Sequence, residues 1–163
     1  MHTYPVYQTG ITLAEMPNNI SCYIQLANCN IKCKGCHSKF LWKKISQTDL
    51  QQILSYVIAS KNKGADMFIV FGDINNDISS DDLLLLVRSA SSILPVCIYS
   101  GADNVEKALG NNYAEILPYL SYIKIGKFNK NLGGLANRNT NQQLFLIKDS
   151  QLTDVTKNLF KGD

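Results

Sequence analysis

Four short apolar runs, each ending at a glycine or leading into a polar loop, constrain the fold of this chain more than any other feature. Segments with polar starts and helically spaced leucine and isoleucine separate the later runs, and they predict helices at 49–63, 79–92 and 104–109. Strands that alternate with helices predict an α/β fold with a mostly parallel sheet. The four runs are SCYIQLA (21–27), MFIVF (67–71), PVCIYSG (95–101) and YIKIG (122–126).

The number of strand–helix units limits how far such a sheet can close. After a glycine-rich connection come one more predicted strand, QLFLI (143–147), and an amphipathic segment at 152–160. These units are too few for a complete eight-fold barrel, so we expect an open, curved partial barrel with right-handed crossovers. A length of 163 residues without a repeat or linker predicts a single domain over residues 1–163.

Composition excludes several classes of partner. The chain is 45% hydrophobic and 18% charged, and its net charge of +3 is too small to argue for nucleic acid. The first residues lack a signal-peptide pattern, and no apolar run is long enough to cross a bilayer. Five cysteines, an odd number, argue against a disulfide framework. We therefore expect a cytoplasmic protein that binds neither nucleic acid nor membrane.

The segment CNIKCKGCH (29–37) concentrates three of the five cysteines directly after the first predicted strand. Cys29, Cys33 and Cys36 are close enough in sequence for their thiolates to converge on one metal centre. Thiolates hold iron–sulfur clusters, and a cubane cluster usually takes four of them. Three would leave one iron without a protein ligand, and catalytic metal sites keep such an open position.

The cysteine pattern alone leaves other sites open. Zinc would need His37 or a distant residue as its fourth ligand, and His37 directly follows Cys36, which makes joint ligation awkward. The second ligand pair typical of structural zinc is missing, and a third cysteine crowds any thioredoxin-like pair. Cys22 and Cys97 lie within predicted strands and have the character of small buried hydrophobic residues. Three cysteines by themselves do not identify the metal.

Polar and glycine residues follow the ends of the predicted strands. Gly72-Asp73, Ser100-Gly101 and Gly126-Lys127 each come just after an apolar run, as the cysteine segment does. In parallel α/β folds, ligands bind at the carboxyl edge of the sheet. The sequence therefore predicts a ligand site at that edge.

Four motifs in order resemble one family. CNIKCKGCHSKFLW resembles the Cys-x3-Cys-x-Gly-Cys-(His/Tyr)-…-Trp block of the anaerobic ribonucleoside-triphosphate reductase activating proteins, which are radical S-adenosylmethionine enzymes. FIVFGDIN resembles their strand ending in Gly-Gly-Asp, and VCIYSG resembles a strand ending in Tyr-(Ser/Thr)-Gly. The stretch YIKIGKFNKNLGGLANRNTNQQLF resembles their C-terminal tail, so the likeness covers nearly all of residues 11–147.

Three residues depart from the family pattern. Phe71 replaces the first glycine of Gly-Gly-Asp, Lys127 stands where proline is usual, and Gln143 stands where arginine is usual. The first departure concerns how a cofactor would meet the loop after residue 71. The other two concern partner docking or loop geometry.

The resemblance implies a fold, a reaction and a set of ligands. The fold would be the partial barrel of the radical S-adenosylmethionine type, and the protein an oxidoreductase that reductively cleaves S-adenosylmethionine to a 5′-deoxyadenosyl radical. That radical would generate a glycyl radical on the large subunit of anaerobic (class III) ribonucleotide reductase, with a low-potential donor such as a flavodoxin or ferredoxin supplying the electron. No side chain would be catalytic beyond the cluster and S-adenosylmethionine. The implied ligands of the 4Fe–4S cluster are Cys29, Cys33 and Cys36, and those of S-adenosylmethionine are Gly72, Asp73, Ser100, Gly101 and His37.

Two other functions remain open at this point. The chain is also compatible with an activase of a different glycyl radical enzyme. The non-enzyme alternative is a small zinc-stabilised binding module.

Overall fold

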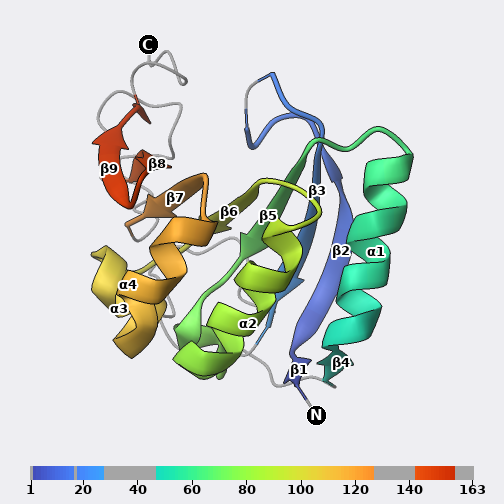
Figure 1. The fold of residues 1–163 in the computed structure, drawn as a ribbon, viewed down its shortest axis with the longest axis horizontal. Coiled ribbons are helices and arrows are strands. Elements are labelled where there is room, and N and C mark those ends of the chain that lie inside the picture. Colours follow the sequence, from blue (N-terminus) through green and yellow to red (C-terminus); the bar gives the residue numbers. More distant parts are fainter. Residues whose placement is uncertain (1, 17, 28–46, 127–141, 157–163) are drawn as a thin grey trace.

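The computed structural model describes residues 2–16, 18–27, 47–126 and 142–156 (Figure 1). One sheet of seven strands forms the centre, and a separate two-stranded sheet joins the chain start to the beginning of the first helix. The strands of the large sheet are β2 (Val6–Thr12), β3 (Ser21–Leu26), β5 (Met67–Phe71), β6 (Val96–Tyr99), β7 (Tyr122–Ile125), β8 (Gln143–Lys148) and β9 (Gln151–Asp154). The small sheet pairs β1 (Thr3–Tyr4) with β4 (Thr48–Asp49).

Helices connect the central strands. The α-helices are α1 (Leu50–Asn62), α2 (Ser80–Ser91), α3 (Val105–Leu109) and α4 (Tyr113–Ile116), and the 3₁₀ turns are η2 (Ile74–Asn76), η3 (Gly110–Asn112) and η4 (Leu117–Tyr119). Within the described residues, none of the helices has the length and apolar character needed to cross a membrane. The predicted helices at 49–63, 79–92 and 104–109 correspond to α1, α2 and α3.

The predicted fold class, a mostly parallel partial barrel of the radical S-adenosylmethionine type, is wrong. The sheet is mixed, with the linear strand order β2-β3-β5-β6-β7-β8-β9. Only the central strands β3, β5, β6 and β7 pair in parallel, whereas β2, β8 and β9 pair antiparallel with their neighbours.

Short connections explain two of the antiparallel pairs. Parallel neighbours need a crossover of a dozen or more residues, and residues 13–20 between β2 and β3 are too few for one. Asp149 and Ser150 alone join β8 to β9, and their φ angles of 52° and 62° are typical of the two-residue turn of a β-hairpin.

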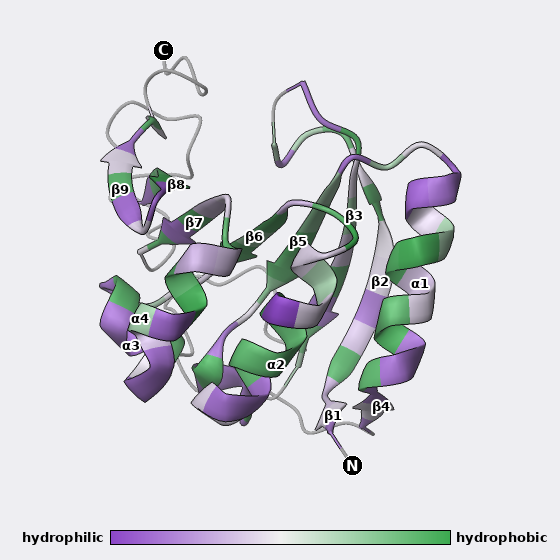
Figure 2. Cartoon of the chain, in the orientation of Figure 1, coloured by the Kyte–Doolittle hydropathy of each residue, from purple (hydrophilic) through white to green (hydrophobic). Residues whose placement is uncertain are grey.

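Side chains of successive strand residues point to opposite faces, and the helices cover one of these faces (Figure 1). On the helix side, Ile24, Phe68 and Ile98 join the apolar faces of α1 and α2 in the larger core cluster. On the other face, Met67, Ile69, Cys97, Tyr99 and Leu144 form a second cluster with Met16. Because β5 and β6 are buried on both faces, they are hydrophobic along their length (Figure 2).

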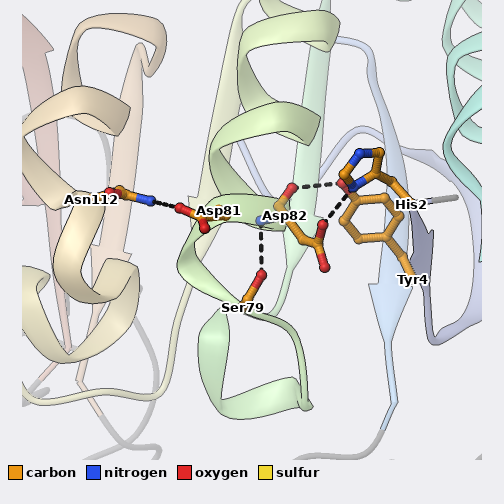
Figure 3. Close-up of polar contacts among 6 residues, drawn as sticks. All are labelled: His2, Tyr4, Ser79, Asp81, Asp82 and Asn112. Carbon is orange, nitrogen blue, oxygen red and sulfur yellow. Dashed lines mark hydrogen bonds and ion pairs between the residues drawn. The ribbon is translucent and has the colours of Figure 1, made fainter.

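The beginning of α2 is tied to the start of the chain (Figure 3). Ser79 caps the helix, since its Oγ accepts a hydrogen bond from the Asp82 amide at 3.0 Å. The Tyr4 hydroxyl donates to the Asp82 carbonyl at 2.6 Å, and His2 Nδ1 lies 2.7 Å from the Asp82 carboxylate. Asn112 Nδ2 donates to Asp81 at 2.5 Å, which joins η3 to the same helix start.

Candidate functional site

The carboxyl ends of the parallel strands meet in one hydrogen-bonded edge. The Gly72 amide donates to the Tyr99 carbonyl at 3.0 Å, and the Ser100 amide donates to the Lys124 carbonyl at 2.8 Å. The Gly126 amide donates to the Ala102 carbonyl at 2.7 Å. Backbone hydrogen bonds therefore join the loops after β5, β6 and β7 to one another.

Asp73 is the buried anchor of this edge. Its Oδ1 accepts from the Asn75 amide at 2.7 Å and from Asn75 Nδ2 at 2.9 Å, and its Oδ2 accepts from Ser100 Oγ. Ser100 Oγ in turn accepts from the Ala102 amide at 2.9 Å. Both carboxylate oxygens are engaged and the residue is 1% exposed, so Asp73 holds the loops after β5 and β6 together.

The electrostatics of Asp73 follow from this position. Burial raises the pKa of its carboxyl group above the ordinary value of 3.8, because a charge is poorly solvated in the interior. The hydrogen bonds from Ser100 and Asn75 favour the charged form and partly offset that shift.

The backbone conformation and close packing at Gly72 require a glycine. Its φ of +140° lies where side chains are rarely tolerated, and a Cβ there would be 2.8 Å from both Asn76 Oδ1 and Leu26 Cβ. This close approach lets the turn after β5 pack against the end of β3. The requirement is independent of any ligand.

Asn76 is a residue that the sequence reasoning missed. Its Nδ2 donates to the carbonyls of Leu26 at 3.2 Å and Ala27 at 2.7 Å, and its Oδ1 accepts from the Asp73 amide at 2.9 Å. It thus ties the end of β3 to the Asp73 loop. The signal was the Asp-x-x-Asn spacing, in which each side chain caps the backbone near the other residue.

The predicted metal ligands lie outside the described residues, namely Cys29, Cys33 and Cys36, and so does His37. Among the described residues, no three histidine, cysteine, aspartate or glutamate side chains gather in a way that suits a metal. The structure therefore describes the edge that leads into the cysteine segment but not the segment itself.

The two other cysteines are packing residues. Cys22 and Cys97 are buried, with free thiols, and belong to the clusters on opposite faces of the sheet. Burial raises the pKa of Cys22 to about 11 and that of Cys97 well above its ordinary value. Metals bind the thiolate form, so these two thiols are poorly suited to ligation.

Phe71, the departure from the family's glycine, packs on the face away from the helices. Its ring lies edge-on between those of Tyr23 and Tyr99, with both centroid distances 5.3 Å. Lys124 Nζ lies 5.0 Å from the centre of the Tyr99 ring. Edge-to-face contacts of this kind stabilise aromatic clusters, so Phe71 has a packing role beside the turn at Gly72.

Comparisons with protein families, curated proteins and solved structures found no match for this chain.

Proposed function

We propose that this protein is an iron–sulfur activase that uses S-adenosylmethionine to generate a glycyl radical on anaerobic ribonucleotide reductase. One observation carries the proposal beyond the sequence motifs. Asn76 donates to the Ala27 carbonyl, so the residue just after β3, two positions before Cys29, is joined to the Asp73 loop, which Ser100 connects to the loop after β6. Ala27, the last described residue before the cysteine segment, therefore lies beside the two other motifs of the resemblance.

The donor set fits a cluster with one open iron. Cys29, Cys33 and Cys36 would hold a 4Fe–4S cluster, and Cys22 and Cys97 are too buried to supply a fourth thiolate. Such a cluster would supply the one electron needed for reductive cleavage of bound S-adenosylmethionine to methionine and a 5′-deoxyadenosyl radical, which would take a hydrogen atom from the partner's glycine. A flavodoxin or ferredoxin would supply that electron.

The chain's own contribution would be to position the ligand. Because both oxygens of Asp73 are already bonded, we assign it the role of fixing the backbone at Gly72 and Ser100. Gly101 is half-buried, so its backbone remains accessible at this edge. His37 would lie next to the cluster ligand Cys36.

The proposal also includes a location and partners. Reduced thiols are stable in the cytoplasm, which suits an odd number of cysteines. The macromolecular partner would be the large glycyl radical subunit of the reductase, with no role for nucleic acid or membrane.

Anaerobic reconstitution with iron and sulfide tests the proposal. The protein should become brown and release 5′-deoxyadenosine from S-adenosylmethionine under a strong reductant. Cys33→Ala should lose this cleavage, whereas the matched variant Cys97→Ala should retain it, because Cys97 lies within β6. A colourless protein that binds one zinc ion and cleaves nothing would rule the proposal out.

The identity of the partner needs a separate measurement. The active protein should produce a glycyl radical signal by electron paramagnetic resonance when mixed with the large subunit of the reductase. A signal only with another glycyl radical enzyme would keep the chemistry and change the partner.

A further inference from the structure

The two ends of the seven-stranded sheet differ in how they are protected. Among the described residues, β2 pairs with β3 alone and β9 pairs with β8 alone. The hairpin of β9 carries Lys148, Asp149 and Asp154, and charges of this kind discourage pairing with another strand. Residues 3–14, which include β2, contain no aspartate, glutamate, lysine or arginine.

Hydrogen bonds at Gly10 show which way the backbone amides and carbonyls point at the centre of β2. The Gly10 amide donates to the Tyr56 hydroxyl at 3.1 Å. The single proton of this hydroxyl is shared between the carbonyls of Gly10 and Tyr23, whose oxygens lie 2.7 Å and 3.1 Å from the hydroxyl oxygen. The Gly10 polar groups therefore face β3, the strand of Tyr23. Because successive residues alternate, the amides and carbonyls of Thr9 and Ile11 face the open edge.

Exposed apolar side chains gather on the hairpin that contains this edge. Ile11 is 55% exposed, Leu13 is 69% exposed and Ile20 is 43% exposed. Clustered apolar exposure of this kind marks interaction surfaces more often than scattered single residues do.

We propose that β2 pairs antiparallel with β2 of a second copy of this chain, across a two-fold axis at Gly10. This register places Thr9 opposite Ile11 of the second copy, and two β-branched residues form a favourable cross-strand pair. Gly10 leaves room at the axis, where the strands of a non-hydrogen-bonded pair approach most closely.

The charge distribution favours a second copy as the occupant. Each chain has a net charge of +3, yet this uncharged edge brings no like charges opposite each other. A two-fold contact also closes on itself, so it gives a dimer rather than a fibre. This inference does not depend on the proposed function.

Sedimentation equilibrium of the full chain, under reducing conditions that exclude a disulfide between copies, tests the dimer. The wild-type protein should have twice the mass of one chain. Ile11→Lys should reduce the mass to that of one chain by placing two lysines next to the axis. The control Ile58→Lys should remain dimeric, because Ile58 is similarly exposed, at 48%, but lies on α1.

Thr9→Pro provides a second test, which acts on the backbone and keeps the exposed apolar residues Ile11, Leu13 and Ile20. Proline removes only an amide that faces the open edge, where it is tolerated in an edge strand, so the variant should fold with the wild-type circular dichroism spectrum and sediment as a monomer. A wild-type protein that is monomeric throughout would overturn the inference. So would a dimer that both Ile11→Lys and Thr9→Pro leave unchanged.

Discussion

Two buried serines in this protein are in opposite hydrogen-bonding situations. Ser100 donates to Asp73 and accepts from the Ala102 amide, whereas Ser21 Oγ has no hydrogen-bond partner in the part of the chain that the structure describes. An unsatisfied buried polar group costs free energy, and a satisfied one leaves its partners unsatisfied when it is removed. The same Ser→Ala change should therefore have different effects at the two sites.

We expect Ser100→Ala to lower the free energy of unfolding by about 1–3 kcal/mol. Ser21→Ala should leave that free energy unchanged or raise it by up to about 1 kcal/mol. Urea unfolding followed by circular dichroism measures both. Equal losses for the two variants would contradict the assigned hydrogen bonds.

Asp73 should make the protein less stable as pH rises, the opposite of the usual effect of a carboxylate. Since burial raises its pKa above 3.8, the folded protein binds this proton more readily than the unfolded chain does. The free energy of unfolding contributed by Asp73 therefore falls as pH rises from about 3.8 through the raised folded value, and is constant above it.

Asp73→Asn removes this titration and leaves the other groups in place. The difference in unfolding free energy, wild type minus Asp73→Asn, should decrease with rising pH across that window. A difference that increases with pH would mean that the hydrogen bonds from Ser100 and Asn75 outweigh burial.

At the residue scale, the sequence predicted which residues lie at the carboxyl edge of the sheet, but not the hydrogen bonds between them. Gly72, Asp73, Ser100 and Gly101 were predicted because they follow apolar runs, and the structure places them at one edge. The sequence does not reveal that Ser100 donates a hydrogen bond to Asp73, because a contact between residues 27 positions apart depends on how two strands pair. The Asp-x-x-Asn spacing was a local signal for Asn76, but its hydrogen bonds to the carbonyls of Leu26 and Ala27 also depend on how two strands pair.

At the scale of elements, α1 begins with a complete capping box. Asp49 Oδ1 accepts from the Gln51 amide at 2.8 Å, and the Gln52 side chain accepts from the Asp49 amide at 3.1 Å. Asp49→Ala should lower the free energy of unfolding by about 1 kcal/mol, because a helix amide loses its partner. Chemical denaturation measures the loss. Gln51→Ala is the matched control, since the Gln51 side chain is exposed and its amide, not its side chain, is capped.

Patterns of hydrophobic residues identified the central elements well. The strands predicted at 67–71 and 122–126 are present as β5 and β7. β5 is buried on both faces and is apolar throughout, whereas burial alternates along β7 and Lys124 interrupts its apolar residues. β2 was not predicted, since its exposed positions and Gly10 interrupt the apolar pattern, although its β-branched and aromatic residues were a usable signal. The direction of β8 has no sequence signature, because an apolar run reads the same in parallel and antiparallel pairs.

At the scale of the whole molecule, the described core is built from one sheet and one layer of helices. The larger cluster joins α1, α2 and the helical turns after β6 to one face of the strands. The alternation of strands and helices predicted the parallel centre but not the antiparallel ends, so the prediction of a barrel is wrong and the sheet is mixed. The antiparallel pairs of β2 and β9 depend on the short connections at 13–20 and 149–150, about which the apolar runs carry no information.

Metal removal should leave this core folded. Treating the reconstituted protein with a chelator is expected to change the unfolding midpoint little, because the two described clusters consist of apolar side chains packed on the sheet. Thermal unfolding of treated and untreated samples, with Cys33→Ala as the metal-free control, measures the change. Cooperative unfolding on chelation would instead favour a zinc-stabilised binding module.

The Tyr56 hydroxyl joins α1 to the edge strand β2, and hydrogen exchange at the Gly10 amide would reveal when this contact opens. The Gly10 amide of β2 donates to the Tyr56 hydroxyl of α1. Its proton can exchange with solvent only when helix and strand separate, whereas amides bonded between strands exchange when the strands part. The exchange rate at Gly10 is therefore a reporter of how often α1 lifts from the sheet.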